Sequence, residues 1–207
     1  MTSLKMLRHE LALPPEQKFY AVVDVEALVL GYVVNVVEQI AFVLYDDDGR
    51  EVWAEKHFIY QPYDNISLVR LYGVPLEIVE RSVAAYKRIT GDEPVHNDPH
   101  KPYERWSVVR RHVQKACQYH ARRVYAKGIS LETSVFYGNI EFLDLAWWGC
   151  PKYPLALHDP LQECRFFAMY IPEIRARSTL SNSSFGNGYW PLHSQKNVDD
   201  TKKQIYL

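Results

Sequence analysis

The sequence predicts an α/β layer fold in which a mixed β-sheet is covered by helices. Three observations lead to this prediction. Apolar, β-branched runs typical of strands dominate residues 18–62. Two long segments with helical apolar spacing follow them. After residue 123, short strand-like runs alternate with short helical segments, which is the order expected of a layered α/β protein.

The first three strands are predicted to form an antiparallel meander. Residues 18–28, KFYAVVDVEAL, have the length and the apolar character of a buried strand. Residues 33–46 are the second predicted strand and residues 51–62 the third. The Asp-Asp-Gly sequence at 47–49 supplies the turn between them.

Two helices are predicted next, at residues 74–91 and 103–123, separated by a loop rich in proline and histidine. Pro75 suits the first turn of the earlier helix and Gly91 ends it. A short strand at 123–128 follows the second helix.

The remaining predicted elements are a helix at 130–138, a strand at 140–148 and a helix that starts at Asp159. Asp159 is a favourable N-cap, and the proline after it suits the first helical position.

One domain, residues 18–174, is predicted between a lead-in at 1–17 and a C-terminal tail at 175–207. The tail is rich in serine, asparagine and glycine, so it is expected to be extended or partly disordered and to be able to bind a protein partner.

The composition narrows the class of protein. The formal net charge of −1 does not mark the whole chain as a nucleic-acid binder. Three cysteines argue against a disulfide scaffold and fit a reducing compartment. A signal peptide and an apolar run of roughly 18 residues are both missing, so we expect an intracellular protein, cytoplasmic or nuclear, with no membrane partner.

Asp24 and Glu26 are the first candidate site residues. They lie two positions apart on the first predicted strand, so both carboxylates point to the same face. Two neighbouring like charges are costly unless a cation lies between them, and oxygen ligands suit Mg²⁺ or Mn²⁺. The alternative interpretation is a strand that ends in a solvated acidic turn.

Two further patterns extend this acidic pair. HDPLQE places His158 and Glu163 at the start of the last predicted helix, with four residues between them. KGISLE places Glu132 after the short strand at 123–128. Together with the Asp24-x-Glu26 strand and the meander, this order resembles the DEDDh, or DnaQ-like, 3′–5′ exonuclease superfamily, which has a ribonuclease H-like fold. The resemblance covers about residues 18–172.

The resemblance implies a phosphodiester hydrolase that binds two Mg²⁺ or Mn²⁺ ions and degrades single-stranded nucleic acid, RNA or DNA. Asp24 would bridge both ions, and Glu26 and Glu163 would complete one site. Glu132 would hold the second ion through water, with Asp144 in reserve, and His158 would deprotonate the attacking water. Glu132 and Glu163 both stand where the superfamily usually has aspartate. An inactive module that binds RNA or a protein partner is therefore the alternative.

A basic segment supports nucleic-acid binding. Residues 105–131 contain no aspartate or glutamate. The basic residues predicted to contact phosphates are Arg110, Arg111, Lys115, Arg122, Arg123 and Lys127. A solvated helix face is the alternative interpretation of the same charges.

Zinc is an alternative cofactor at the last predicted helix. Cys150, His158 and Cys164, with a carboxylate such as Glu132, have the ligand types of a four-coordinate zinc site. The Maelstrom domain, an exonuclease-like fold with a Glu-Cys-His-Cys zinc site, is similar in this respect. The cysteines can also be buried simply as small apolar side chains. The pairing of His158 and Glu163 with Asp24-x-Glu26 explains the histidine better than the cysteines do.

Overall fold

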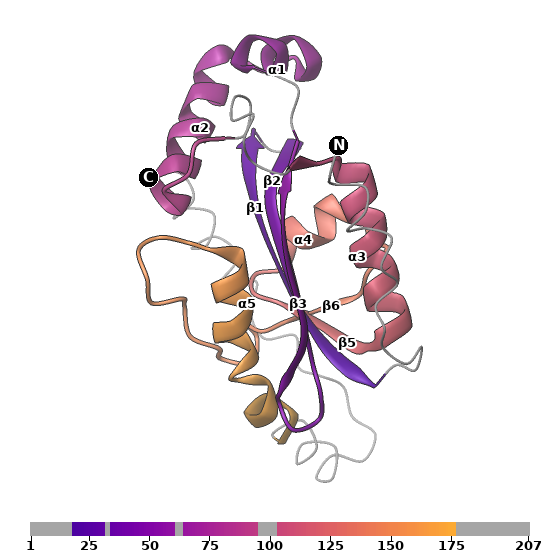
Figure 1. Cartoon of the computed structure of the whole chain (residues 1–207). Coiled ribbons are helices and arrows are strands. Elements are labelled where there is room, and N and C mark those ends of the chain that lie inside the picture. The colour runs from indigo at the N-terminus through magenta and orange to yellow at the C-terminus, as the bar shows by residue number, and fades with distance from the viewer. Residues whose placement is uncertain (1–17, 32–33, 61–63, 95–102, 177–207) are drawn as a thin grey trace, which may run out of the picture. The chain divides into compact units, whose positions relative to one another are not determined.

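A six-stranded mixed sheet, with strand order β4-β3-β2-β1-β5-β6, lies at the centre of the chain (Figure 1). Its strands are β1 (Phe19–Leu30), β2 (Val34–Tyr45), β3 (Glu51–Ile59), β4 (Tyr103–Glu104), β5 (Ala121–Ala126) and β6 (Phe142–Asp144). β1, β2 and β3 form the predicted antiparallel meander. β5 runs parallel to β1, and β6 runs parallel to β5. This is the ribonuclease H-like α/β arrangement that the sequence predicted.

The computed structural model describes residues 18–31, 34–60, 64–94 and 103–176. The described residues up to Pro172 form one compact unit, and every element named here belongs to it. The predicted lead-in, and the predicted tail from residue 177 onward, lie outside the described residues. None of the described helices is long and apolar enough to cross a membrane.

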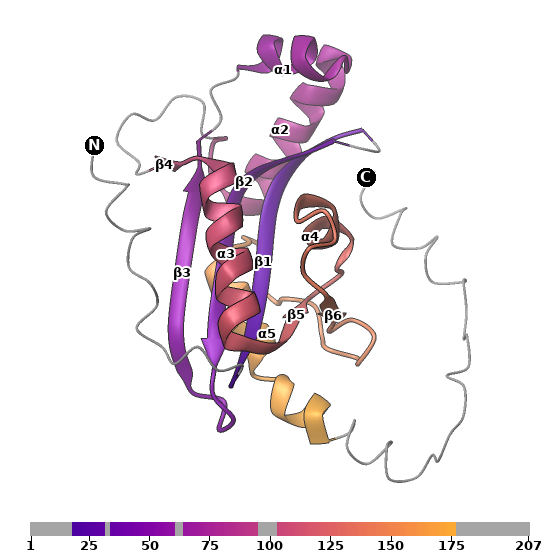
Figure 2. The same cartoon turned by 90° about the vertical axis from the view of Figure 1, so that its right-hand side faces the viewer.

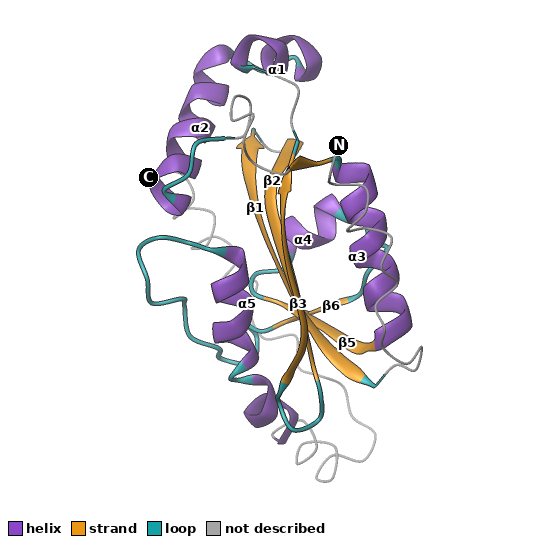
Figure 3. Ribbon diagram, viewed as in Figure 1, coloured by secondary structure: helices purple, strands orange, loops and turns teal. Residues whose placement is uncertain are grey.

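Helices cover both faces of the sheet, and α3 and α5 lie on opposite sides of it (Figures 1 and 3). The helices are α1 (Asn65–Tyr72), α2 (Leu76–Thr90), α3 (Trp106–His120), α4 (Ser130–Val135) and α5 (Pro160–Ala168). Figure 2 shows α3 running along the meander, with α4 beside β1.

Alternation along β1 separates the two faces. Ala21 and Val23 belong to the main core, together with Val109 and Val113 of α3. The even-numbered side of β1 meets α5 instead, where the Cys164 thiol lies 3.5 Å from the carbonyl oxygen of Val22. Asp24 is an even-numbered residue of β1 and so lies on the α5 face.

Two elements were not predicted. Helix α1 is capped by Asp64, whose side chain accepts a hydrogen bond from the Ser67 amide, and it ends at Gly73 in the left-handed conformation. Strand β4 pairs with β3, placing Tyr103 beside Phe58. Because those first residues join the sheet, the helix predicted at 103–123 begins only at Trp106, and it ends where β5 starts.

The strand predicted at 140–148 is shorter than expected. Pairing with β5 extends only from Phe142 to Asp144, and turns follow. The Asp144 side chain accepts hydrogen bonds from the amides of Gly128 and Ala146, at 2.9 and 2.8 Å. It therefore holds the chain at the end of the strand, which is a structural role for the residue that the resemblance offered as a reserve metal ligand.

Candidate functional site

Strand β1 contributes two acidic side chains to the α5 face of the sheet, of which Asp24 is buried and Glu26 is partly buried. Asp24 lies opposite Ala41 of β2, and Glu26 lies opposite Gln39. Asp24 is only 7% exposed. The register between the two strands shifts directly after Glu26, so the acidic pair comes just before a β-bulge.

Helix α5 brings His158 and Glu163 to the same place. Its N-cap is Asp159, as predicted, because that side chain accepts hydrogen bonds from the amides of Leu161 and Gln162. The His158 amide donates to the carbonyl oxygen of Ile89, at 2.8 Å, which anchors the approach to the helix. His158 thus precedes the helix, and Glu163 lies one turn inside it.

His158 forms an ion pair with two of the carboxylates. Its Nδ1 lies 2.8 Å from Glu163 Oε1 and 3.7 Å from Glu26 Oε1. These contacts, the one with Glu163 foremost, raise the pKa of His158 to about 10. The three ligand atoms all lie within 4.8 Å of one another, which is close enough to share one metal ion.

Glu132 lies in the first turn of α4 and is 3% exposed. Burial raises its pKa to about 8, and the charges of Glu26, Asp144 and Glu163 add to the shift. The pKa of Asp24 is raised well above its usual range by burial first, then by Glu163, Glu26 and Glu132. The charges of the four predicted carboxylates therefore act on one another, and among them only Glu26 and Glu163 belong to the close group of ligand atoms around His158.

We call the four carboxylates and the histidine the acidic cluster: Asp24, Glu26, Glu132, Glu163 and His158. Its donor atoms fit a hard divalent cation. Asp24 Oδ2 and Glu132 Oε2 are buried and have no hydrogen-bond partner among the described residues. Buried carboxylate oxygens without partners are costly, and several in one site repel one another. Mg²⁺ and Mn²⁺ prefer such oxygen ligands, so a cation of this type would satisfy both the charges and the open acceptor sites.

The residues of the alternative zinc site, Cys150, His158 and Cys164, do not form a close group of ligand atoms. Cys164 is fully buried, and its thiol faces the backbone, 3.5 Å from Val22 O and 3.6 Å from Ala41 O. Among the described residues, no cysteine belongs to a close group of potential metal ligands. The structure therefore does not bring Cys150, His158 and Cys164 together around one ion.

The predicted basic residues are only partly free to bind phosphate. Arg110 stacks over the ring of Tyr137, at 4.6 Å from its centroid. Arg122 pairs with Asp47 at 2.6 Å, and Lys127 contacts the carbonyl oxygen of Cys150. Arg110, Arg111 and Lys115 lie on α3, across the sheet from α5. Arg111, Lys115 and Arg123 are exposed.

Lys56 is a cation that sequence analysis missed. Its Nζ lies 2.7 Å from Asp159 Oδ2, at the start of α5. Burial raises the pKa of Glu26, and the charge of Lys56 opposes that rise. Only the pairing of β3 with β2 brings this lysine toward α5, so no local pattern marks it.

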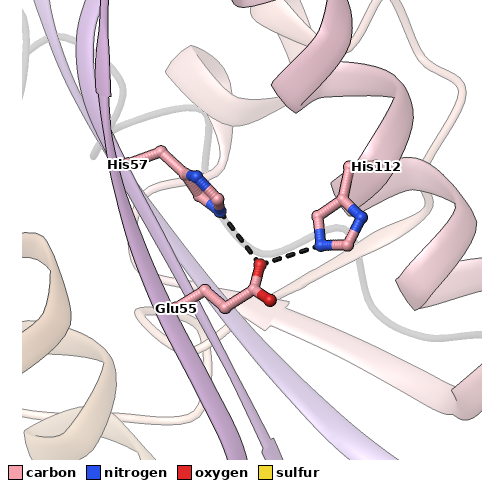
Figure 4. Close-up of side chains that lie close together, drawn as sticks. All are labelled: Glu55, His57 and His112. Atoms are coloured by element: carbon pink, nitrogen blue, oxygen red, sulfur yellow. Dashed lines mark hydrogen bonds and ion pairs between the residues drawn. The ribbon is translucent and has the colours of Figure 1, made fainter. Parts of the chain in front are cut away.

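A second group of potential ligands, Glu55, His57 and His112, was also missed (Figure 4). The signal for two of its members was present, since Glu55 and His57 are two residues apart on a strand, as Asp24 and Glu26 are. The third comes from α3, which no spacing in the sequence connects to β3.

Neither a protein-family model nor a curated protein matches the chain. Solved structures do match. A moderately thermophilic Exonuclease I from Methylocaldum szegediense superimposes with a TM-score of 0.54 at 13% identity, covering 78% of this chain and 41% of the other. Escherichia coli Exonuclease I in complex with a dT13 oligonucleotide gives 0.48 at 8% identity, covering 81% and 43%.

The likeness to the Methylocaldum szegediense enzyme confirms the exonuclease-type, ribonuclease H-like fold that the sequence predicted. The chain spans about two fifths of the length of these solved structures. At such low identity the likeness concerns the fold alone.

Proposed function

We propose that the chain is a metal-dependent 3′–5′ exonuclease that acts on single-stranded nucleic acid at the acidic cluster. The observation that carries the proposal is the close group of Glu26, Glu163 and His158. The charges of Asp24 and Glu132 are coupled to this group, and each of the two has a buried oxygen with no hydrogen-bond partner among the described residues. Likeness of fold to Exonuclease I, an enzyme solved in complex with a dT13 oligonucleotide, supports the class of substrate.

Asp24, Glu26 and Glu163 are the residues that would hold two Mg²⁺ or Mn²⁺ ions, with Glu132 completing the second position. Such ions lower the pKa of a bound water and stabilise the negative charge that develops on the phosphate. The charges of Glu26, Glu132 and Glu163 all act on Asp24, so we choose it for the test substitution.

His158 is placed to accept the proton of the attacking water. Its side chain is 37% exposed, whereas that of Glu163 beside it is 6% exposed. Water therefore reaches the imidazole more easily than it reaches the carboxylates. A general base at this position is expected to contribute about 10²–10⁴ in rate. In the metal-free chain the ion pairs with Glu163 and Glu26 raise the pKa of His158 to about 10 and keep its imidazole protonated. Both carboxylates are also proposed metal ligands, so a bound cation would compete with that proton for their oxygens and favour the neutral base.

A degradation assay tests the proposal. Labelled single-stranded RNA and DNA are incubated with the chain in Mg²⁺, in Mn²⁺ or in EDTA. We expect a metal-dependent ladder from the 3′ end that disappears in Asp24→Asn. Glu80→Gln, which removes an exposed carboxylate on α2, is the matched control and should keep full activity. A folded chain that gives no ladder in either metal would contradict the enzyme proposal.

An inactive module that binds nucleic acid or a protein partner is the second candidate. Glu163 favours it, because a glutamate stands there in place of the usual aspartate and already forms an ion pair with the proposed base. Binding of the labelled strand that persists in Asp24→Asn, without cleavage in the unmutated chain, would support this candidate instead.

A further inference from the structure

Glu55, His57 and His112 form a close group on the α3 face of the sheet (Figure 4). Glu55 and His57 share one face of β3, where they lie opposite Phe42 and Ile40 of β2. Phe42 and Ile40 belong to the core that packs against α3. His112 reaches the same point from that helix. We call these three residues the α3–β3 cluster.

The three ligand atoms of the α3–β3 cluster converge on one point. Glu55 Oε2 lies 2.9 Å from His57 Nε2 and 2.8 Å from His112 Nε2. All three atoms lie within 4.8 Å of one another. The side chains are largely buried, with exposed fractions between 11% for His57 and 19% for Glu55. Removal from bulk water strengthens any interaction of these groups with a cation.

Other side chains hold the cluster in this orientation. Glu104 Oε2, on β4, lies 2.7 Å from His57 Nδ1 and so fixes the ring with its Nε2 toward Glu55. The Trp53 indole donates to Glu55 Oε1 at 2.9 Å, which leaves Oε2 for the cluster. A carboxylate on the far nitrogen of an imidazole is the usual support of a histidine that binds metal.

We propose that Glu55, His57 and His112 bind a divalent transition-metal ion, with zinc as the best fit to the donors, and that Glu104 is a positioning residue for this site. Two imidazoles and one carboxylate are a zinc ligand set, and Mg²⁺ prefers oxygen donors. With three protein ligands, a fourth position is open to water. The ion would join β3 to α3 directly.

The α3–β3 site is separate from the acidic cluster in place and in chemistry. It lies on the face of the sheet that α3 covers, whereas His158 and Glu163 approach from the α5 side (Figure 1). It contains nitrogen donors where the acidic cluster has mainly carboxylates. The inference therefore holds whether or not the chain is a nuclease.

A charge network without a metal is the competing account of the same contacts. The carboxylates of Glu55 and Glu104 flank both nitrogens of His57. They raise its pKa to about 9, against the effect of burial. A protonated His57 would then bridge them with no ion present. The two accounts differ in two measurable properties. One is whether the chain retains zinc, and the other is whether Glu104→Gln weakens zinc binding.

The test measures zinc bound to the full chain. The protein is stripped with a chelator, mixed with Zn²⁺ in excess Mg²⁺, desalted and analysed for metal. We expect about one zinc per chain, lost in His57→Gln and in His112→Gln and kept in the control His158→Gln, which alters the acidic cluster. A stripped chain that retains no zinc, or one whose zinc is lost in His158→Gln alone, would overturn the proposal.

Glu104→Gln tests the positioning role. Loss of a supporting carboxylate typically weakens metal affinity by about 10- to 100-fold, so we expect that change in the zinc dissociation constant with the stoichiometry unchanged. An unchanged dissociation constant would overturn the role of Glu104.

If His57→Gln or His112→Gln does not fold, its loss of zinc says nothing about the site. The absorption spectrum of bound Co²⁺ then tests the site in a chain whose proposed ligands are intact. The His158→Gln chain should show visible bands of a cobalt ion with nitrogen ligands, because the α3–β3 cluster is intact in it. Their absence would overturn the site.

Discussion

Glu132 shows at the scale of a single residue why the acidic cluster is costly without a cation. Its side chain is buried, one of its oxygens has no hydrogen-bond partner among the described residues, and its pKa is about 8. The folded chain therefore keeps a proton on Glu132 over a range in which the unfolded chain has lost it. The metal-free fold is more stable with Glu132 protonated, whereas the proposed metal binding needs the ionised carboxylate.

The stability of the metal-free chain should depend on pH through Glu132. Its folded pKa of about 8 is higher than the ordinary value of 4.5, so the contribution is fully present below about 4.5 and declines as pH rises toward 8. The expected slope is about 1.4 kcal/mol per pH unit in that window. Denaturant unfolding in EDTA, from pH 5 to 8, should show this slope reduced in Glu132→Gln. An identical slope in both chains would refute the assignment.

Glu163→Asp tests whether this chain has adapted to the longer side chain. Glu163 Oε1 reaches to 2.8 Å from His158 Nδ1, and removing one methylene withdraws the carboxylate from that contact. A displacement of about 1 Å can cost about a hundredfold in rate. We expect a loss of that order in the strand-degradation assay. A gain in activity would show instead that glutamate impairs the site.

Helix α5 is the element on which the acidic cluster depends most. It carries Glu163, its first residues follow His158, and its N-cap Asp159 also pairs with Lys56 of β3. A short helix of this kind is oriented by its cap and its contacts more than by intrinsic propensity. Asp159 therefore helps to set the geometry of two candidate site residues, His158 and Glu163.

Asp159→Ala should lower both stability and activity. Loss of an N-cap side chain costs about 0.5–2 kcal/mol, and the partly exposed ion pair with Lys56 adds little. Chemical denaturation should show this loss, and the degradation assay a lower rate. Asp159→Asn keeps a capping oxygen and is the matched control, expected to recover most of the stability. Equal destabilisation by both substitutions would argue against the cap as the cause.

Across the whole molecule, cations are expected to stabilise the fold from two opposite faces of the sheet. The acidic cluster lies on the α5 side and the α3–β3 cluster on the other (Figure 1). A ligand that binds only the folded chain stabilises it by mass action, by about 2.7 kcal/mol at a hundred times its dissociation constant. Each site should therefore be visible in the stability of the whole chain.

Mn²⁺ should raise the unfolding temperature more at pH 8 than at pH 5. A proton occupies Glu132 at the lower pH, since burial raises its pKa to about 8, and it competes with the ion. Burial also raises the pKa of Asp24, which acts in the same direction. Thermal unfolding at the two pH values measures the difference. The shift should disappear in Asp24→Asn and persist in Glu80→Gln. An equal shift in Asp24→Asn would place the Mn²⁺ elsewhere.

Local patterns determined much of the fold and of the acidic cluster. Runs of β-branched residues predicted the three meander strands, and the Asp-Pro start predicted α5. The spacing of Asp24 and Glu26 placed both carboxylates on one face of a strand. These predictions succeeded because each depends on residues within one or two turns or strand repeats of one another.

The tertiary structure alone decided which elements meet. It paired β4 with β3, and it buried Asp24 and Glu132 without enough partners. It also brought His112 to Glu55 across a sequence separation of 57 residues. A strand or helix pattern records which face is apolar, and it does not record which other element covers that face. Contacts between elements come from sheet order and helix packing, which are properties of the whole fold.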